Sequence, residues 1–406
     1  MKNQLYCQLL LFFLFVLGVT ESINAQWPQW RGVNRDGICT EENLLKEWPV
    51  SGPRRIWAVN SVGDGFTSAI VGENTVFTVG KIDSLEYLTA IDFTGKVLWQ
   101  QAFGRAHKGE WPESRCTPTY YKNKLYAFTG YGDFACLDSK TGSILWRFNS
   151  TEKFGAVGNP EFAFCESPLV VEDKVILTTA GNQTTLVALN YLNGETVWKS
   201  ESLSDTCDYV SPVFIEYKDK KMIFAGTRKY FFAADLSTGK IFFKTTSLPG
   251  IIPTLVNKTS IYCNDGQRGK LFSYNPENND FSFTWCDSVP GSYMGGAVAV
   301  GDHIFGTNRN AAMGFHCIDR NTGKLVFSNK TIKESSLIAT KDRIYSYDGN
   351  DGKVYLLKPN GNNVDVAGSF RVTIGSGPCL AHMSIAKGML FIRHGKVLMA
   401  YDIRQS

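Results

Sequence analysis

One motif recurs along this chain of 406 residues, and its period limits the folds that the chain can adopt. The motif combines an apolar stretch, Asp, Thr-Gly-Lys and a closing Trp, and it reads LTAIDFTGKVLW at residues 88–99. Further copies lie at residues 134–146, 186–198, 232–243 and 316–327, with a divergent copy at 272–285. The first four copies place their glycines 47, 52 and 45 residues apart, and the next clear glycine follows after 84 residues, which is two units. Strand-rich repeats of about 40–50 residues predict a β-propeller.

Each repeat has the pattern of a four-stranded antiparallel blade. In the second unit, apolar stretches at residues 116–121 and 124–130 precede the two stretches of the motif, 134–137 and 143–148. The Asp of the motif is suited to accept backbone N–H bonds, and the Gly to adopt the positive φ of a tight turn. We expect the closing Trp or Phe to lie on the outermost strand and to pack against the next blade.

The number of repeats predicts how the ring closes. Six units span residues 67–99, 117–146, 167–198, 211–243, 253–285 and 297–327, and a poorly matched seventh spans 335–370. The eighth begins near Met383 and ends at residues 397–404, so no chain remains for its outermost strand. We expect residues 54–58 to pair antiparallel with 397–402, because an open sheet edge invites aggregation. The sequence thus predicts an all-β fold, an eight-bladed β-propeller of four-stranded antiparallel blades, closed by an N-terminal strand pairing into the last blade.

The N-terminus has the features of a secretory signal peptide. Lys2 precedes an apolar run at residues 9–19, and small residues end at Ala25. The run is too short to span a bilayer, so we expect no transmembrane anchor. The predicted organisation is a signal peptide at residues 1–25, an N-terminal strap at 26–52 and a single propeller domain at 53–406. Removal of the signal near Ala25 would leave a periplasmic or secreted protein.

Charge and cysteine content narrow the partners and the covalent chemistry. The net charge of +4 comes without a basic run, which argues against nucleic acid as a partner. Two of the nine cysteines after Ala25, Cys136 and Cys317, occupy the position two residues before the repeat Asp. The same position holds other small residues: Ala90, Ala188, Ala233, Ser273 and Ala400. We therefore interpret Cys136 and Cys317 as small buried hydrophobic residues; the other cysteines stay unassigned.

The candidate ligand site lies at the funnel, the end of the channel where the inner strands begin. The residues just before these strands are Phe66, Arg115, Glu166, Asp208, Tyr209, Tyr293, Met294 and His382. Arg115 with Tyr209 and Tyr293 would suit an anionic sugar or a peptide carboxylate, through a guanidinium fork and aromatic platforms. In the alternative interpretation, Arg115 pairs with Glu166 on a solvated rim. The five histidines are scattered, so the sequence predicts no metal site, and it assigns no catalytic residue.

The repeats resemble those of the PQQ-like (pyrroloquinoline-quinone-type) propeller family, and WPQWRGVNRDG at residues 27–37 is similar to the N-terminal strap of its exported bacterial members. The resemblance implies an eight-bladed fold. Quinoprotein dehydrogenases of this kind bind the quinone with calcium and stack it on a ring formed by adjacent cysteines, whereas this chain has no Cys-Cys pair. Members of the BamB type are non-catalytic interaction platforms.

On this basis we expect an exported, non-catalytic binding or scaffold protein. Its expected ligand is a protein partner or a polysaccharide or oligosaccharide fragment, and we expect a monomer without a cofactor, neither the quinone nor calcium. The alternative is an enzyme, either a quinoprotein-type dehydrogenase or a carbohydrate-active enzyme that uses the carboxylates of the central funnel.

Overall fold

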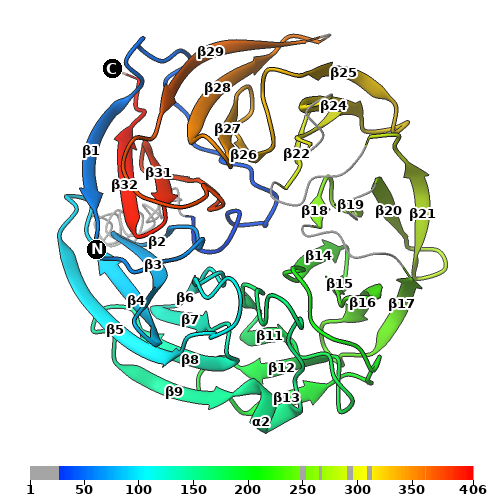
Figure 1. The fold of residues 1–406 in the computed structure, drawn as a ribbon. Helices are drawn as coiled ribbons and strands as arrows, with labels where there is room; N and C mark the ends of the chain where they lie inside the picture. The colour runs from blue at the N-terminus through cyan, green and yellow to red at the C-terminus, as the bar shows by residue number, and fades with distance from the viewer. Residues whose placement is uncertain are drawn as a thin grey trace, which may run out of the picture.

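The structure, a computed structural model, describes residues 27–246, 253–264, 268–289, 296–308, 313–361 and 363–405. Their strands form eight four-stranded antiparallel sheets arranged in a ring, so the prediction of an eight-bladed propeller is confirmed (Figure 1). The predicted signal peptide lies outside the described residues. Within them, the one α-helix, α2 (Ser150–Phe154), is short, and no helix has the length and apolar character needed to cross a membrane.

The first four blades follow each other without interruption. Blade 1 consists of β2 (Ile70–Gly72), β3 (Thr75–Ile82), β4 (Leu85–Ile91) and β5 (Val97–Arg105). Blade 2 consists of β6 (Thr119–Tyr121), β7 (Lys124–Phe128), β8 (Asp133–Asp138) and β9 (Ile144–Asn149). Blade 3 consists of β10 (Leu169–Val171), β11 (Lys174–Thr178), β12 (Leu186–Asn190) and β13 (Thr196–Lys199). Blade 4 consists of β14 (Val213–Tyr217), β15 (Lys220–Gly226), β16 (Tyr230–Asp235) and β17 (Ile241–Thr246).

The last four blades complete the ring. Blade 5 consists of β18 (Thr254–Leu255), β19 (Ser260–Asn264), β20 (Gly269–Asn275) and β21 (Asp280–Cys286). Blade 6 consists of β22 (Val298–Val300), β23 (His303–Gly306), β24 (Phe315–Asp319) and β25 (Leu325–Asn329). Blade 7 consists of β26 (Ser335–Ala339), β27 (Ile344–Asp348), β28 (Lys353–Pro359) and β29 (Val364–Arg371). Blade 8 consists of β30 (Ser384–Ala386), β31 (Met389–His394), β32 (Val397–Asp402) and β1 (Arg54–Val59).

The Asp and Gly of the motif build the turn between the third and fourth strands of a blade. In blade 2, Oδ1 of Asp138 accepts hydrogen bonds from the backbone N–H groups of Lys140 (3.0 Å) and Thr141 (2.8 Å). Gly142 has a φ of +75°, and a Cβ added to it would lie 2.7 Å from the indole of Trp99 in the preceding blade. Glycine is therefore required both for the backbone conformation and for the close approach of the ring.

The closing aromatic residue joins neighbouring blades, as predicted. The indole N–H of Trp99 donates to the carbonyl of Ser139 in blade 2 (3.3 Å), and Trp198 donates in the same way to Leu236 in blade 4 (3.0 Å). Within their own blade, the aromatic rings lie opposite the small residue of the motif. The pairs include Cys136 with Trp146 and Cys317 with Phe327, and both cysteines are buried, which confirms their interpretation as small core residues.

The fifth copy of the motif departs from the predicted register. Leu271, and not Ser273, lies opposite Trp285, while Ser273 pairs with Ser282. The hairpin of blade 5 joins Asn275 to Asp280 through residues 276–279, much as residues 139–142 join Asp138 to Ser143 in blade 2, but its bulge lies farther from the turn, after Leu271. The assignment of Ser273 to the small position was wrong because the displaced bulge shifts which residue lies opposite the closing aromatic residue.

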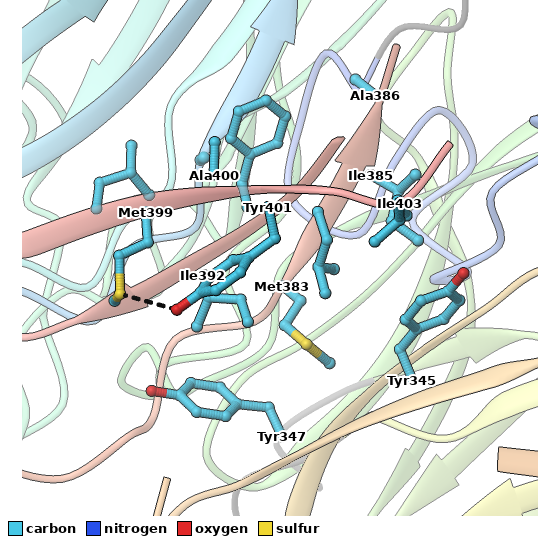
Figure 2. Close-up of a cluster of buried hydrophobic side chains, with 14 of the residues drawn as sticks. Tyr345, Tyr347, Met383, Ile385, Ala386, Ile392, Met399, Ala400, Tyr401 and Ile403 are labelled. Atoms are coloured by element: carbon cyan, nitrogen blue, oxygen red, sulfur yellow. Dashed lines mark hydrogen bonds between the residues drawn. The ribbon is translucent and has the colours of Figure 1, made fainter. Parts of the chain in front are cut away.

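The N-terminal strand closes the ring as predicted. β1 pairs antiparallel with β32, with Arg54 opposite Asp402 and Trp57 opposite Ala400. Trp57 then supplies the missing aromatic residue of blade 8, because its indole N–H donates to the carbonyl of Phe93 in blade 1 (3.0 Å). Blade 8 shares one hydrophobic cluster with blade 7, in which Tyr347 of β27 meets the side chains of blade 8 (Figure 2).

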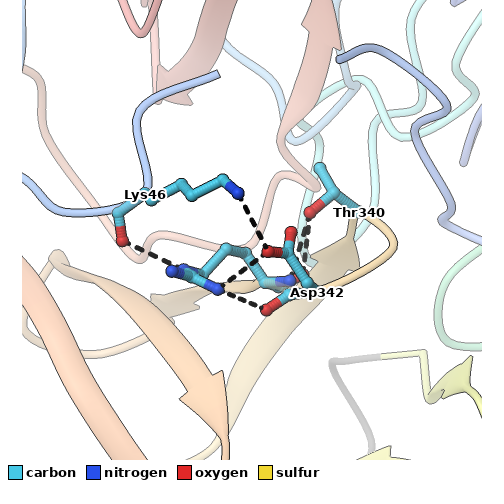
Figure 3. A network of polar contacts seen from close by, with 4 residues as sticks. Lys46, Thr340 and Asp342 are labelled. Carbon is cyan, nitrogen blue, oxygen red and sulfur yellow. Dashed lines mark hydrogen bonds and ion pairs between the residues drawn. The ribbon is translucent and has the colours of Figure 1, made fainter. Parts of the chain in front are cut away.

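The strap completes blade 7, which explains why its repeat matched poorly. Gly368 stands opposite Leu356, where the other blades carry an aromatic residue. Trp48 of the strap packs there instead, since a Cβ on Gly368 would lie 2.5 Å from the Cβ of Trp48. The ring of Trp48 contacts Phe370, with 5.3 Å between ring centroids. Next to it, the strap is fixed to blade 7 through Lys46, whose carbonyl accepts the Nε–H of Arg343 (3.0 Å) and whose ammonium lies 4.0 Å from Asp342 (Figure 3).

Candidate functional site

The N-terminal strap crosses the central channel of the propeller. In Figure 1 it is the dark-blue segment in the middle of the ring. Its backbone is hydrogen-bonded to the inner strands of several blades. In blade 1 the N–H of Val71 donates to the carbonyl of Trp27 (2.8 Å), and in blade 2 the N–H of Tyr120 donates to the carbonyl of Pro28 (2.7 Å). On another side, Cys39 N–H donates to Ala339 (2.7 Å). The strap therefore fills space that a ligand in the channel would need.

Two buried arginines hold the strap in place. Arg35 donates through Nη1 to the carbonyls of Ser167 (2.9 Å) and Pro212 (3.0 Å), just before the inner strands of blades 3 and 4. Arg31 donates through Nη2 to the carbonyls of Asp36 (2.9 Å) and Ala297, the latter in front of blade 6. Burial lowers the pKa of Arg31 to about 10 and that of Arg35 to about 9, so both stay charged at neutral pH. Backbone carbonyls thus stabilise two charges inside the channel.

Glu166 lies beneath the mouth of the funnel rather than on its rim. Its side chain is 3% exposed, and its two carboxyl oxygens lie 3.0 and 3.1 Å from the backbone nitrogen of Thr178. Burial raises its pKa to about 8, against a smaller opposing effect from Thr178 and Arg35. Glu166 is therefore mainly protonated at neutral pH. The alternative interpretation, an ion pair with Arg115 on a solvated rim, does not describe this position.

Glu86 is a second buried carboxyl group near the funnel, and sequence reasoning missed it. Its Oε1 accepts the N–H of Gly130 in blade 2 (3.0 Å), and burial raises its pKa to about 7. Arg393 lies in the same region and donates from Nη1 to the hydroxyl of Thr78 (2.9 Å) and from Nη2 to the carbonyl of Gly63 (2.8 Å). The contacts of Arg393 link blade 8 to blade 1, and the hydrogen bond of Glu86 links blade 1 to blade 2. Both residues therefore serve the packing between blades.

Three of the predicted residues come together at the mouth of the funnel. Arg115 donates from Nη1 to the carbonyl of Phe162 (2.8 Å), and the ring of Phe162 packs edge-on against Tyr209, with 5.1 Å between centroids. Asp208 beside it accepts a hydrogen bond from Nδ2 of Asn159 (3.0 Å). Blades 2, 3 and 4 thus each contribute a loop. We call this group the mouth cluster; its members are Trp111, Arg115, Phe162, Asp208 and Tyr209.

The remaining predicted residues lie elsewhere or beyond the described part. His382 is 7% exposed and packs edge-on against Trp30 of the strap, with 5.6 Å between ring centroids. It therefore belongs to the wall of the filled channel. Phe66 is half-buried, and its N–H donates to the carbonyl of Ser114 (2.7 Å). Tyr293 and Met294 lie outside the described residues.

Trp111 is the member of the mouth cluster that the sequence did not reveal. It precedes the inner strand of blade 2 by too many residues for the repeat alignment to include it. Its side chain is 44% exposed, its φ is +57°, and its carbonyl accepts a hydrogen bond from Nη2 of Arg115. The Nε–H of Arg115 makes no hydrogen bond to the described residues. The cluster therefore offers an exposed indole beside an available cationic donor.

Two hollows lie on the circumference of the ring. One, of about 660 Å³, lies between blades 7 and 8, and another, of about 480 Å³, lies between blades 1 and 2. Both are lined by residues of the outer strands. The repeat pattern points only to the funnel and predicts neither hollow.

Comparison with known proteins identifies the family. A family model described as outer membrane protein assembly factor BamB matches residues 84–329, which is more than half of the chain. The chain belongs to this family. BamB from Moraxella catarrhalis has a similar structure, with a TM-score of 0.62 and 16% sequence identity over 87% of this chain and 98% of that one.

Two further solved structures are similar to this BamB-family propeller. The computationally designed Ika8 protein gives a TM-score of 0.60 with 12% identity, over 86% of this chain and 100% of that one. The quinohemoprotein alcohol dehydrogenase from Comamonas testosteroni gives 0.42 with 13% identity, over 93% and 80%. At these identities the likeness concerns the fold alone. No curated protein sequence matches the chain.

The residues of this BamB-family chain do not fit the quinone and calcium that some PQQ-like propellers bind. The chain has no adjacent pair of cysteines to form the stacking ring. In the described ranges, no three His, Cys, Asp or Glu side chains are grouped so that they could hold a metal ion. Trp30, Arg31 and Arg35 of the strap occupy the centre of the channel. The guanidinium groups of both arginines are already hydrogen-bonded to backbone carbonyls.

Proposed function

We propose that this protein is an exported, non-catalytic propeller that binds a protein partner and acts as a scaffold for it. The observation that carries the proposal is the filled channel, in which Arg31 and Arg35 of the strap occupy the place of a funnel ligand. Membership of the BamB family, whose description is that of an assembly factor, supports the same function. The predicted signal peptide is consistent with action outside the cytoplasm.

The mouth cluster is the part of the funnel face that we propose contacts the partner. Trp111 presents an exposed indole, and Arg115 retains an N–H donor next to the ring of Phe162, 5.9 Å from the guanidinium carbon. Aromatic and arginine side chains dominate the binding energy of protein interfaces. A peptide carboxylate suits this arrangement, and a polysaccharide fragment with an acidic group is the second candidate ligand, since it would use the same donor.

The proposal is tested by site-specific photo-crosslinking in intact cells. A benzoylphenylalanine residue at position 111 should give a cross-link to a protein, which mass spectrometry identifies, whereas the same residue at position 192 should not. Leu192 is the matched control because it is 53% exposed but lies in the outer turn of blade 3. The substitution Arg115→Ala should weaken the cross-link at position 111.

The enzyme alternative has its own assay. Purified protein is incubated with pyrroloquinoline quinone and Ca²⁺, and dye-linked oxidation of alcohols and sugars is measured. We expect no oxidation above the background of the heat-denatured protein. Quinone-dependent turnover would refute the scaffold function, and an acidic oligosaccharide that binds in an Arg115-dependent manner without any cross-linked protein would favour the polysaccharide ligand.

A further inference from the structure

The junction of blades 7 and 8 differs from the other blade junctions. At the others, the outer strand carries an aromatic residue at the position that pairs with the third strand just beyond the bulge. These residues are Trp57, Trp99, Trp146, Trp198, Phe243, Trp285 and Phe327. β29 carries Gly368 at this position. Trp48 of the strap fills the inner part of the gap, and a hollow of about 660 Å³ remains on its outer side.

The hollow is a groove with an apolar floor and a proline-rich wall. Phe370 of β29 and Tyr401 of β32 lie 4.9 Å apart between ring centroids and form the floor. The wall is the segment between the strap and β1, which reads Pro-Val-Ser-Gly-Pro at residues 49–53. The tight turn of this segment is closed by a hydrogen bond from Gly52 N–H to the Pro49 carbonyl (2.8 Å). At its tip, Val50 is fully exposed, which leaves an apolar side chain without cover at the rim.

Guanidinium groups outnumber carboxylates around this groove. Arg54, Arg55 and Arg371 line it, and Arg404 lies next to it. Only two carboxylates face these four cations in the ion pairs of the described chain: Asp402 is shared by Arg54 (3.1 Å) and Arg404 (2.7 Å), and Asp351 takes Arg371 (2.9 Å). Arg55 has no ion pair with a carboxylate there. Four positive and two negative charges leave an excess of about two positive charges at the rim.

We propose that this groove binds an extended acidic segment of a protein partner, in which carboxylates alternate with apolar side chains. The excess of guanidinium groups selects the carboxylates, and the floor of Phe370 and Tyr401 accepts the apolar side chains. A free inorganic anion would use only the rim and a neutral hydrophobic segment only the floor. The inference rests on the proposed scaffold function and adds a second contact surface, far from the mouth cluster on blades 2, 3 and 4.

The hollow between blades 1 and 2 provides an internal control. It has a similar size, about 480 Å³, and a similar apolar lining that includes Phe103 and Phe148. Its charges are balanced, because Arg105 and Arg147 are matched by Asp133 and Glu152. Arg105 is held by Asp133 through two hydrogen bonds of 2.8 and 2.7 Å. This hollow should therefore show no preference for acidic peptides.

The experiment uses the full mature chain and a defined probe. The probe is a fluorescein-labelled nonapeptide in which Glu alternates with Leu or Phe, and its binding is measured by fluorescence polarisation. A second peptide has Lys in place of every Glu. We expect the acidic peptide to bind at least about tenfold more tightly than the basic one. Added salt should weaken this binding, since exposed charges are screened.

Three variants locate the binding. Arg55→Glu and Val50→Asp should each weaken binding of the acidic peptide by about tenfold, because each places a negative charge at the rim. Arg147→Glu, in the control hollow, should leave it unchanged. All three positions are exposed, and circular dichroism with a thermal scan verifies that each variant is folded.

Each other result overturns the inference. Equal binding of the two peptides, or equal binding by wild type and Arg55→Glu, would show that the groove does not select acidic segments. Arg55-dependent binding of heparin without binding of the peptide would assign the groove to an acidic polysaccharide instead. If the scaffold function is correct, none of these results abolishes the cross-link at position 111. If that cross-link is lost while peptide binding is retained, the result counts against the mouth cluster alone.

Discussion

The aromatic residue that closes the ring gives a sharp prediction. Trp57 is 8% exposed, and its indole lies against Gly95 of blade 1, where a Cβ would come within 2.8 Å of the ring system. We expect Trp57→Ala to destabilise the fold strongly. A buried aromatic residue removes about 150–250 Å² from water, which corresponds to about 4–6 kcal/mol at 25 cal/mol per Å². Measured Trp-to-Ala changes in protein cores cost about 3–5 kcal/mol, so we expect about 4 kcal/mol.

A second variant separates the ring from its hydrogen bond. Trp57→Phe keeps an aromatic ring in the slot but loses the N–H that donates to Phe93 (3.0 Å). It should cost about 1 kcal/mol for the hydrogen bond, in addition to the smaller ring. Trp99→Ala and Trp198→Ala should resemble Trp57→Ala, because these side chains occupy the same position in blades 1 and 3.

The assay is urea unfolding followed by far-ultraviolet circular dichroism, which does not depend on the fluorescence of the removed tryptophan. Stability changes are taken from the shift of the midpoint at a constant slope. Trp111→Ala is the control, since this side chain is 44% exposed, and it should change stability by no more than about 0.5 kcal/mol. If Trp57→Ala destabilised the protein no more than Trp111→Ala, the closure of the ring through Trp57 would be wrong.

Three further predictions concern Trp48 of the strap, the buried carboxyl group of Glu166 and the edge of the last blade. Trp48→Ala should cost about 3–5 kcal/mol in calorimetry because Trp48 completes blade 7, and an unchanged melting temperature would contradict this. Burial raises the pKa of Glu166 to about 8 in the folded state, so its contribution to stability is complete below the unfolded pKa of about 4.3 and is lost as the pH rises through 8. In Glu166→Gln the unfolding free energy should therefore fall less between about pH 5 and 8 than in the wild type. If the pH profiles of the variant and the wild type ran parallel, the raised pKa of Glu166 would be wrong. Deletion through Trp57 should cause aggregation by exposing β32, whereas deletion through Gln26 should not, and light scattering distinguishes the two.

The fold could be predicted because its determinants repeat. Each Asp, Gly and closing aromatic residue acts within one blade or on the next, so the period alone gives the strand order. The closure followed from counting, since the eighth repeat lacks its outermost strand and the segment around Trp57 matches it. The error in register occurred where a bulge changed position. Ser273 was misplaced because the bulge between β20 and β21 lies farther from the turn than in blades 2, 3 and 4.

The site was predictable only in part because its key segment is not repeated. Arg115, Asp208 and Tyr209, three of the residues predicted just before inner strands, lie close together, since Phe162 from the loop before blade 3 contacts both Arg115 and Tyr209. The entry of Arg31 and Arg35 into the channel could not be predicted, because WPQWRGVNRDG occurs once and has no copy to align. Glu166 was predicted to face a ligand in the funnel or, in the alternative, to pair with Arg115 on the rim, and its burial was missed for the same reason. Its environment depends on the strap and on Thr178, and neither is visible in the repeat pattern.

The strap also decides how the ring is held shut. β1 joins β32 through pairs such as Val59 with Leu398, roughly 340 positions apart, and closing such a loop in a flexible chain costs about 5 kcal/mol in entropy beyond a constant term. This is about the contribution expected from Trp57 alone, so the strand pairing by itself would leave little margin. The strap adds Trp48 in blade 7 and the buried arginines in the channel, and these contacts hold the N-terminal segment to blades on both sides of the closure. Because they use the inner surface of the ring for stability, the surfaces that we propose for partner binding are the loops at the mouth and the groove between blades 7 and 8.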